Sequence, residues 1–344
     1  MHNQRIIVIA AIAFYRRSLS LLATLQVLAL ALCSIFMVSP TPLHAQTWPQ
    51  KPIRILIGFA AAGPPDIGTR IIAPKLGELL GQPLVIENRP GAGGVIAMEA
   101  TAKAAPDGYT MGLGTVGTLF LAKALLPTAP YDPQNFVPVG IFAKTQFIVI
   151  THPNVPANTL KEFVDLAKKQ PGKFNYGAST PGSPPHMLAE MFKDQAGVDI
   201  FGITYKGSAD AVQRFLAGDV QMIVDGYTVL GPLITSGKAR ALMVSSPQRM
   251  KKLPDVPTAL EVGMPNYVIE TFFSFVAPPG TPAAIPRRMN ADIVKVMQEK
   301  PMIEAMDKLG LDAYASTPEE LGGIIKNDWP KWNNAVKAAG IKAQ

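Results

Sequence analysis

The sequence predicts an α/β fold of two lobes, joined by two extended crossovers, with a ligand cleft between the lobes. From Pro52 onward, short apolar strands alternate with amphipathic helices, which is the pattern of a parallel sheet covered on both faces. Two long β-rich runs, Phe136–His152 and Val268–Ala277, interrupt this alternation. One α/β block lies between these runs and another lies outside them. We therefore expect the chain to cross into a second lobe and return, with a hinge at the crossovers.

The first 45 residues are predicted to be a cleaved secretion signal rather than part of the fold. Arg5, Arg16 and Arg17 supply positive charge, Ser18–Val38 is a long apolar run, and Leu43-His44-Ala45 is an acceptable cleavage site. The alternative is an uncleaved membrane anchor, because the apolar run is near the length that spans a bilayer. The general secretory route is favoured over a twin-arginine route.

The composition of the remaining 299 residues argues against nucleic-acid binding and against cysteine-based sites. The leader carries three of the 32 Lys and Arg residues and no acid, so 29 basic and 25 acidic residues remain. These charges are scattered, which gives nucleic-acid binding little support. The one cysteine, Cys33, leaves with the leader, so the mature chain has no thiol, disulfide or cysteine metal site. The length suggests two domains of moderate size.

The elements are predicted in a regular order. The first block contains strand Ile53–Phe59, helix Asp66–Leu80, strand Leu84–Ile86, helix Val95–Ala104 and strand Tyr109–Leu113. The later strands are Phe147–Thr151, Phe174–Ala178, Phe201–Tyr205, Val220–Asp225 and Ala239–Ser245. The C-terminal helices, Arg287–Leu309 and Pro318–Ala339, are expected to pack on the first lobe. Residues 46–145 with 272–344 are predicted to form lobe 1, and residues 146–271 to form lobe 2.

The residues that carry function are expected at turns that follow strands, because ligands of open α/β sheets bind beyond the carboxyl ends of the strands. Four such turns are Ala60–Asp66, Gly114-Thr115, Ala178–His186 and Tyr205–Ser208. In the third turn, Ser183 is predicted to cap a helix whose free amides, with nearby hydroxyls, would suit an anion. Capping without any ligand is the alternative.

Three charged candidates each have a structural alternative. Asp66 either holds the first turn and contacts a ligand, or only stabilises a helix N-terminus. Lys206 either complements a carboxylate or is solvated. Asp225 ends a strongly apolar strand, where it either contacts a ligand or forms a turn before Gly226.

Enzyme functions find less support. The sequence has no G-x-S-x-G elbow, and its mature part holds only His152 and His186, which are far apart. Ser183 and His186 could pair catalytically, but helix capping already explains their spacing. Gly112–Gly117 matches G-x-G-x-x-G, yet Asp132, at about the expected distance, does not end a strand. We therefore expect no catalytic residue, cofactor or metal.

Six segments in order resemble one family of exported proteins. They are Trp48–Arg54, Glu87–Gly94, Ala105–Thr110, Gly182–His186, Tyr205–Ser208 and Leu253–Thr258. From Trp48 to nearly the C-terminus, the chain resembles the extracytoplasmic solute receptors of the tripartite tricarboxylate transporters, the Bug-type receptors. The resemblance implies the type II periplasmic binding protein fold, with two lobes, two crossover strands and a cleft.

The resemblance also implies which residues contact the ligand. In the family, a carboxylate is gripped between the first-strand turn and the serine/glycine turn of the other lobe, partly through ordered waters. The matching candidates here are Ala61, Ala62, Gly63, Asp66, Thr115, Ser179, Thr180, Gly182, Ser183, Lys206, Ser208 and Asp225. Phe272 and Phe273 on the second crossover either form an aromatic wall or pack in the hinge.

The first turn departs from the family pattern. The family usually has a Pro/Gly-rich loop with Ser or Thr before the Asp, whereas this chain has Ala60-Ala61-Ala62 followed by Pro64 and Pro65. The hydroxyl is missing, and each proline lacks an amide donor. Carboxylate binding is still expected, but the size or the far end of the ligand would differ.

These observations predict a monomeric periplasmic receptor that captures a small organic carboxylate and delivers it to the membrane permease subunits of a tripartite tricarboxylate-type transporter. One alternative is an exported enzyme acting on a small carboxylate in the same cleft. Another is a ligand-sensing receptor for a membrane signalling partner. The sequence does not identify the ligand.

Overall fold

The computed structural model describes residues 48–338, apart from the side chains of residues 331, 335, 337 and 338. The predicted secretion signal lies outside the described residues. Residues from Pro49 onward belong to one compact unit. Between residues 48 and 338, every helix is too short or too polar to cross a lipid bilayer.

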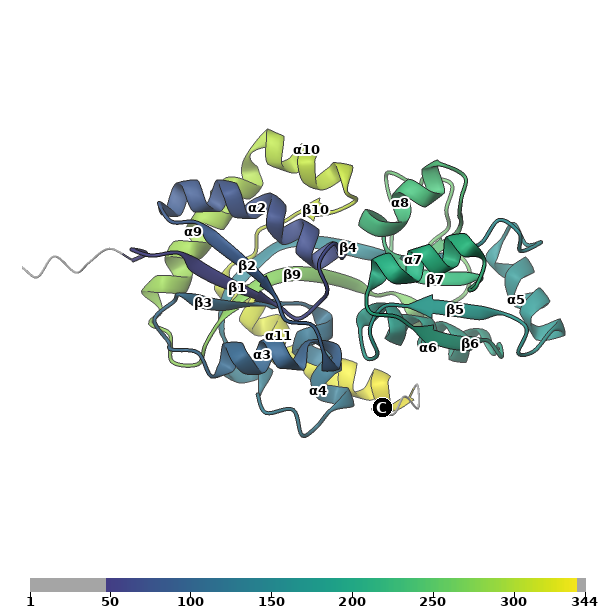
Figure 1. Ribbon diagram of the computed structural model, residues 1–344, viewed down its shortest axis with the longest axis horizontal. Helices are drawn as coiled ribbons and strands as arrows, with labels where there is room; N and C mark the ends of the chain where they lie inside the picture. The colour runs from purple at the N-terminus through teal and green to yellow at the C-terminus, as the bar shows by residue number, and fades with distance from the viewer. Residues whose placement is uncertain (1–47, 339–344) are drawn as a thin grey trace, which may run out of the picture. The chain divides into compact units, whose positions relative to one another are not determined.

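Strands and helices alternate along most of the chain (Figure 1). The strands are β1 (Ile53–Ile57), β2 (Leu84–Asn88), β3 (Thr110–Gly114), β4 (Val137–Thr151), β5 (Asn175–Ala178), β6 (Phe201–Thr204), β7 (Met222–Gly226), β8 (Arg240–Val244), β9 (Glu270–Ala277) and β10 (Asp312–Ala313). The α-helices are α2 (Pro64–Leu80), α3 (Val95–Ala102), α4 (Ala122–Leu125), α5 (Leu160–Lys169), α6 (Pro184–Ala196), α7 (Ser208–Ala217), α8 (Tyr227–Thr235), α9 (Ala284–Gln298), α10 (Lys300–Lys308) and α11 (Pro318–Ala338). A π-helical turn, η2 (Gly117–Leu121), follows β3.

Two parallel α/β parts are joined by two crossover strands, as the sequence predicts. The strand order is β2-β1-β3-β9-β4-β7-β5-β6, and β8 and β10 also pair with β4. β1 is parallel to β2 and β3, and β5 is parallel to β6 and β7. β4 pairs with β9 up to Gln146 and with β7 from Phe147 onward. The predicted lobe boundary at residues 145 and 146 lies near the point where β4 changes from β9 to β7. The exact boundaries stay a prediction.

Helices cover both faces of each part. Figure 1 shows α2, α9 and α10 on one face of the β2-β1-β3-β9 part, and α3, α4 and α11 on the other. In the second part, Phe215 of α7 and Leu230 of α8 pack in one core cluster with Ile223 of β7. Phe192 of α6 packs in a different cluster with Val224, the next residue of β7. The alternation along β7 therefore directs successive side chains to opposite helical layers.

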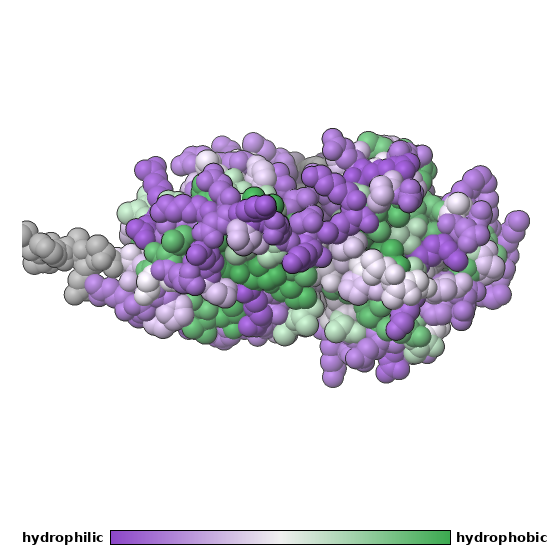
Figure 2. All heavy atoms as spheres, turned by 90° about the horizontal axis from the view of Figure 1, so that it is seen from above, coloured by the Kyte–Doolittle hydropathy of each residue, from purple (hydrophilic) through white to green (hydrophobic). Residues whose placement is uncertain are grey.

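The surface carries no single dominant apolar area on the face shown in Figure 2, where hydrophilic residues predominate and apolar residues form separate patches. The large exposed apolar side chains come from different elements. They are Val85, Ile96, Phe201, Leu216, Leu260 and Ile303.

Two elements differ from the sequence predictions. The predicted helix Arg287–Leu309 is split at Glu299, whose φ of −71° and ψ of 125° are extended. Pro301 explains the break, because its ring cannot follow a preceding helical turn. The other is β8, which runs antiparallel to the crossover β4 and has only an isolated parallel bridge, from Val244 to Thr258, among the described residues.

Candidate functional site

A pocket of about 50 Å³ is lined by both α/β parts and by the two crossover strands. Its walls are formed mainly by the turns that follow β1, β3, β5, β6 and β7. The lining residues are Phe59, Ala60, Gly63, Pro64, Pro65, Thr115, Thr145, Phe147, Ser179, Thr180, Pro184, Pro185, Gly207, Ser208, Asp225, Gly226, Thr271 and Phe273. The site therefore lies at the carboxyl ends of the parallel strands, where the fold class places it.

Half of the predicted ligand contacts lie in this lining. They are Gly63, Thr115, Ser179, Thr180, Ser208 and Asp225. The others lie outside it. Ala61, Ala62 and Lys206 are exposed, Gly182 is half-buried, and Asp66 and Ser183 are buried. Phe273 is part of the lining, whereas Phe272 is buried elsewhere.

Besides Phe273, which the sequence offered as part of an aromatic wall, three other residues of the crossover strands contribute to the pocket. Thr145 and Phe147 of β4, and Thr271 of β9, all line the pocket. The sequence offers little signal for the two threonines, because Thr145 lies between Lys144 and Gln146 and Thr271 follows Glu270. Each therefore looks like part of a polar, solvent-facing interruption of the strand, whereas the structure buries both.

The two helices that start at opposite walls begin alike. Pro64-Pro65 begins α2 and Pro184-Pro185 begins α6, and all four prolines line the pocket. Because proline has no amide hydrogen, the first two positions of either helix cannot donate a hydrogen bond to an anion. At each of these helix starts, two apolar rings replace two of the expected amide donors, and the amide of the third residue, Asp66 or His186, has no carbonyl within the helix to bond.

The hydrogen bonds around α6 also correct the predicted helix cap. Ser183 occupies the N-cap position, but its hydroxyl makes no cap bond and is 2.7 Å from the Ser179 hydroxyl. Its amide donates to the Thr180 carbonyl at 3.1 Å. The Gly182 amide donates to Nδ1 of His186 at 3.1 Å. The turn is thus stabilised internally, and the predicted Ser183 side-chain cap is wrong.

The start of α7 has the first-turn amides that proline removes from α2 and α6. Gly207 is its N-cap, Ser208 is its first residue, and no proline occurs in its first turn. The first intrahelical bond runs from the Ala211 amide to the Gly207 carbonyl at 3.2 Å. The preceding amides of this turn have no carbonyl within the helix to bond, so they favour an anion at the helix N-terminus.

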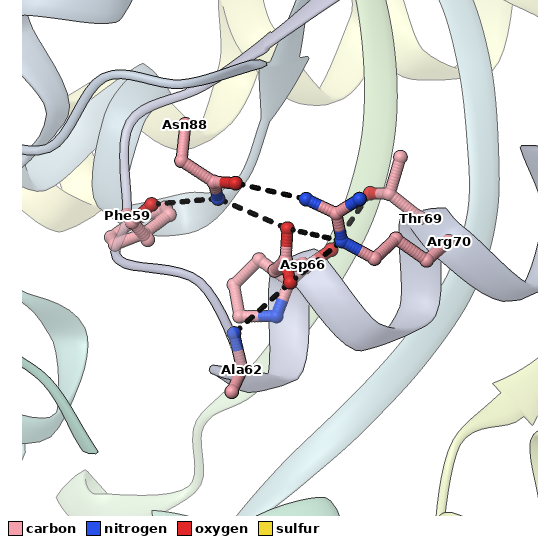
Figure 3. Close-up of polar contacts among 7 residues, drawn as sticks. Phe59, Ala62, Asp66, Thr69, Arg70 and Asn88 are labelled. Carbon is pink, nitrogen blue, oxygen red and sulfur yellow. Dashed lines mark hydrogen bonds and ion pairs between the residues drawn. The ribbon is translucent and has the colours of Figure 1, made fainter. Parts of the chain in front are cut away.

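A network of hydrogen bonds around the buried Asp66 carboxyl holds the β1–α2 turn in place (Figure 3). Asp66 accepts from the Ala62 amide at 3.0 Å and from Nε of Arg70 at 2.9 Å. The Asn88 amide group donates to Asp66 and to the Phe59 carbonyl, both at 3.0 Å. Arg70 in turn donates to the Asn88 side chain at 3.0 Å. Asp66 therefore joins the turn to the end of β2 from behind the pocket wall.

This network sets both the charge of Asp66 and the shape of the turn. Burial by itself would raise the pKa of Asp66, but the hydrogen bonds from Arg70, Ala62 and Asn88 outweigh it and hold the pKa below its ordinary value. Ala62 has a φ of 63°, a conformation that costs a residue with a side chain about 1 kcal/mol or more. The carboxylate that accepts its amide hydrogen helps to stabilise this conformation.

Asp225 is the one ionisable side chain among the pocket-lining residues that the structure describes. Its side chain is almost fully buried, and Oδ1 accepts from the Gly226 amide at 2.7 Å. Burial raises the pKa of Asp225 to about 6, although bonds from the Ser208 hydroxyl and the Gly226 amide oppose the rise. Asp225 thus lies at the end of β7, bonded to the residue that precedes α8, and places a titratable carboxyl in the pocket.

The two α/β parts come close together at two glycine residues that line or adjoin the pocket. A Cβ atom on Gly117 would lie 2.7 Å from Cγ of Pro184, and one on Gly207 would lie 3.0 Å from Cβ of Ala60. In each pair, one residue belongs to each α/β part. Glycine therefore permits a close approach at these points, which narrows the pocket.

No group of three or more His, Cys, Asp and Glu side chains within residues 48–338 is placed to hold a metal ion. The binding capacity of the pocket comes instead from hydroxyls, amides, one carboxyl and apolar rings.

Comparisons with known proteins identify the family of the chain. Residues 69–341 match the family described as the tripartite tricarboxylate transporter family receptor. Protein BugT of Bordetella pertussis (strain Tohama I) is 34% identical over 318 residues, which cover 91% of this chain and 98% of BugT. Among solved structures, R. palustris Rpa4515 with adipate is 30% identical, with a TM-score of 0.81, over 86% of this chain and 99% of that one. MatC from Rhodopseudomonas palustris with bound malate is 28% identical, with a TM-score of 0.79, over 84% of this chain and all of that one.

Proposed function

Because the chain belongs to the tripartite tricarboxylate transporter receptor family, we propose that it is a periplasmic receptor that binds a small organic carboxylate for a transporter of this kind. The observation that carries the proposal is the pocket, which combines the first turn of α7 with the hydroxyls of Ser179, Thr180 and Ser208. Two structurally similar proteins have been solved with adipate and with malate, which supports the class of ligand.

The wider role follows from the same proposal. The predicted secretion signal at residues 1–45 would deliver the protein to the periplasm. Its partners would be the membrane permease subunits of the transporter. The receptor would act as a monomer and deliver the bound acid to them. We propose binding without turnover, so an acid incubated with the protein should be recovered unchanged.

The strength of binding requires both sides of the pocket. A micromolar dissociation constant corresponds to about 8 kcal/mol. A helix N-terminus supplies at most ~2 kcal/mol, and each charge-assisted hydrogen bond supplies ~1.5–3 kcal/mol. The turn that follows β1 and the start of α7 lie on different α/β parts. One carboxylate therefore has to contact both parts at once, and closure of the parts around it would complete the site.

A thermal-shift screen tests the proposed function. The purified protein would be heated with di- and tricarboxylates, hydroxy acids, amino acids, aromatic acids, sugars and peptides. A true ligand at 100 times its dissociation constant should add about 2.7 kcal/mol of stability and raise the melting temperature. Shifts with sugars or peptides, and with none of the acids, would contradict the carboxylate proposal.

Gly117→Ala should weaken binding. The new methyl carbon would lie 2.7 Å from Cγ of Pro184, so the two walls could no longer approach as closely. We expect a loss of affinity of about tenfold or more, because overpacking costs ~1–3 kcal/mol. Calorimetric titration with the acid found by the screen measures it.

Gly323→Ala is the matched control. Gly323 lies inside α11, and a Cβ there would meet nothing within 4 Å. This variant should keep its affinity and gain up to about 1 kcal/mol of stability from the better helix propensity of alanine. Equal affinities for both variants and the wild type would show that close approach at Gly117 is not needed for binding.

A further inference from the structure

The crossover strands place a hydroxyl in the pocket that the protein itself does not satisfy. Among residues 48–338, Oγ1 of Thr271 is buried without a hydrogen-bond partner, and Thr271 lines the pocket with 4% of its surface exposed. Leaving such a hydroxyl unpaired costs free energy, so its retention at this position needs a reason.

A second hydroxyl lies directly beside it. Thr145 of β4 pairs in register with Thr271 of β9, so the two side chains project from adjacent positions on neighbouring strands. The Thr145 hydroxyl makes only long contacts, 3.4 Å to the Gly310 carbonyl and 3.5 Å to the Gln146 carbonyl. Both threonines line the pocket, and both are almost fully buried.

The neighbours of this pair are apolar. Phe147 lies two residues after Thr145 on β4, and Phe273 lies two residues after Thr271 on β9. Both rings line the pocket, as do the four prolines that begin α2 and α6. The threonine pair is therefore a small polar site on an otherwise apolar wall. It is separate in sequence from the amide and hydroxyl groups at the start of α7.

We propose that Thr145 and Thr271 together bind a hydroxyl group of the ligand, and that the preferred ligand is a short hydroxy acid. This inference rests on the proposed function, because it assumes that the carboxylate is held by the turns of the same pocket. A ligand hydroxyl can donate to one threonine and accept from the other. The cavity of about 50 Å³ also favours a short acid.

Matched pairs of acids that differ by one hydroxyl test the inference. Calorimetric titrations would compare malate with succinate, lactate with propionate, and 3-hydroxybutyrate with butyrate. For the wild type, we expect the hydroxy acid of the best-bound pair to bind about three to ten times more tightly, as one or two hydrogen bonds allow. Thr271→Val keeps the shape of the side chain and removes the hydroxyl, so it should reduce this ratio to below about twofold.

Thr151→Val is the matched control. Thr151 is also on β4, and its Oγ1 is likewise buried without a partner in the described part of the chain, but it does not line the pocket. This variant should keep the wild-type ratio. Thr145→Val provides a second variant of the pair, should Thr271→Val have a lower melting temperature than the wild type.

The outcomes separate this inference from the proposed function. If none of the six acids binds the wild type, this inference is overturned. The carboxylate proposal is then contradicted for short acids as well. If acids bind but the unsubstituted members bind equally well, the inference alone is overturned. The same holds if Thr271→Val and Thr145→Val both keep the wild-type ratio, since the hydroxyls would then be satisfied by water rather than by ligand.

Discussion

Asp66→Asn is expected to lower the free energy of unfolding by about 3 kcal/mol. The carboxylate of Asp66 is almost fully buried and accepts hydrogen bonds from Ala62, Arg70 and Asn88. Asparagine keeps one acceptor oxygen but loses the charge and the second one, so about two of these hydrogen bonds are lost, and each bond to a charged group is worth ~1.5–3 kcal/mol. The lower end applies here because the Arg70 side chain is 49% exposed and can turn to solvent.

Urea unfolding at several pH values checks this prediction. The pKa of Asp66 is lowered in the folded state, so its stabilising contribution is present above the unfolded pKa of about 4 and is lost as the pH falls through the folded value. The difference between wild type and variant should therefore shrink below about pH 4. Asp165→Asn is the control, since it removes only an exposed ion pair with Lys161 on α5. Equal stability of Asp66→Asn and the wild type at neutral pH would contradict the role given to the network.

Asp225→Asn is expected to raise the stability at neutral pH by about 2–3 kcal/mol. Burial raises the pKa of Asp225 to about 6, some two units above that of an unfolded aspartate, and each unit corresponds to about 1.4 kcal/mol. Because the folded pKa is raised, this group favours the folded state fully below about pH 4. That advantage is lost as the pH rises through 6. Asparagine can still accept from the Gly226 amide and carries no charge to bury.

The same substitution should remove a pH dependence of binding. An anionic ligand beside Asp225 raises the pKa of this carboxyl further, so carboxylate binding is accompanied by proton uptake. For the wild type, whose Asp225 has a pKa of about 6, we expect the affinity for an acid to rise by up to about tenfold between pH 7 and pH 6 and to level off towards pH 5, where the free protein is already protonated. In Asp225→Asn the affinity should be nearly constant over this range. A wild-type affinity that falls with decreasing pH would instead indicate a cationic group of the ligand beside Asp225.

The overall architecture could be predicted because it depends on patterns that the sequence displays directly. Two long β-rich runs identified the crossovers that the structure shows as β4 and β9. The four turns after strands supply 11 of the 18 lining residues, since ligands of open α/β sheets bind at that edge. The break between α9 and α10 was missed, although Pro301 gave a local signal for it.

Other features of the site depend on contacts that a single sequence does not reveal. The role of Asp66 is set by Asn88, which lies 22 residues away and becomes its neighbour only when β2 pairs with β1. Ser183 looked like a helix cap by type and position, but the nearby Ser179 hydroxyl competes for its side chain. Thr145 and Thr271 are 126 residues apart, and only strand register brings them together.

A crystal structure of the protein with the acid identified by the thermal-shift screen tests the central claim most directly. The account predicts one acid molecule in the pocket, with its carboxylate between the β1–α2 turn and the first turn of α7. It also predicts contacts of that carboxylate with Ser179, Thr180 or Ser208. An acid bound at another surface, or one held by a single α/β part with the other part distant, would contradict it.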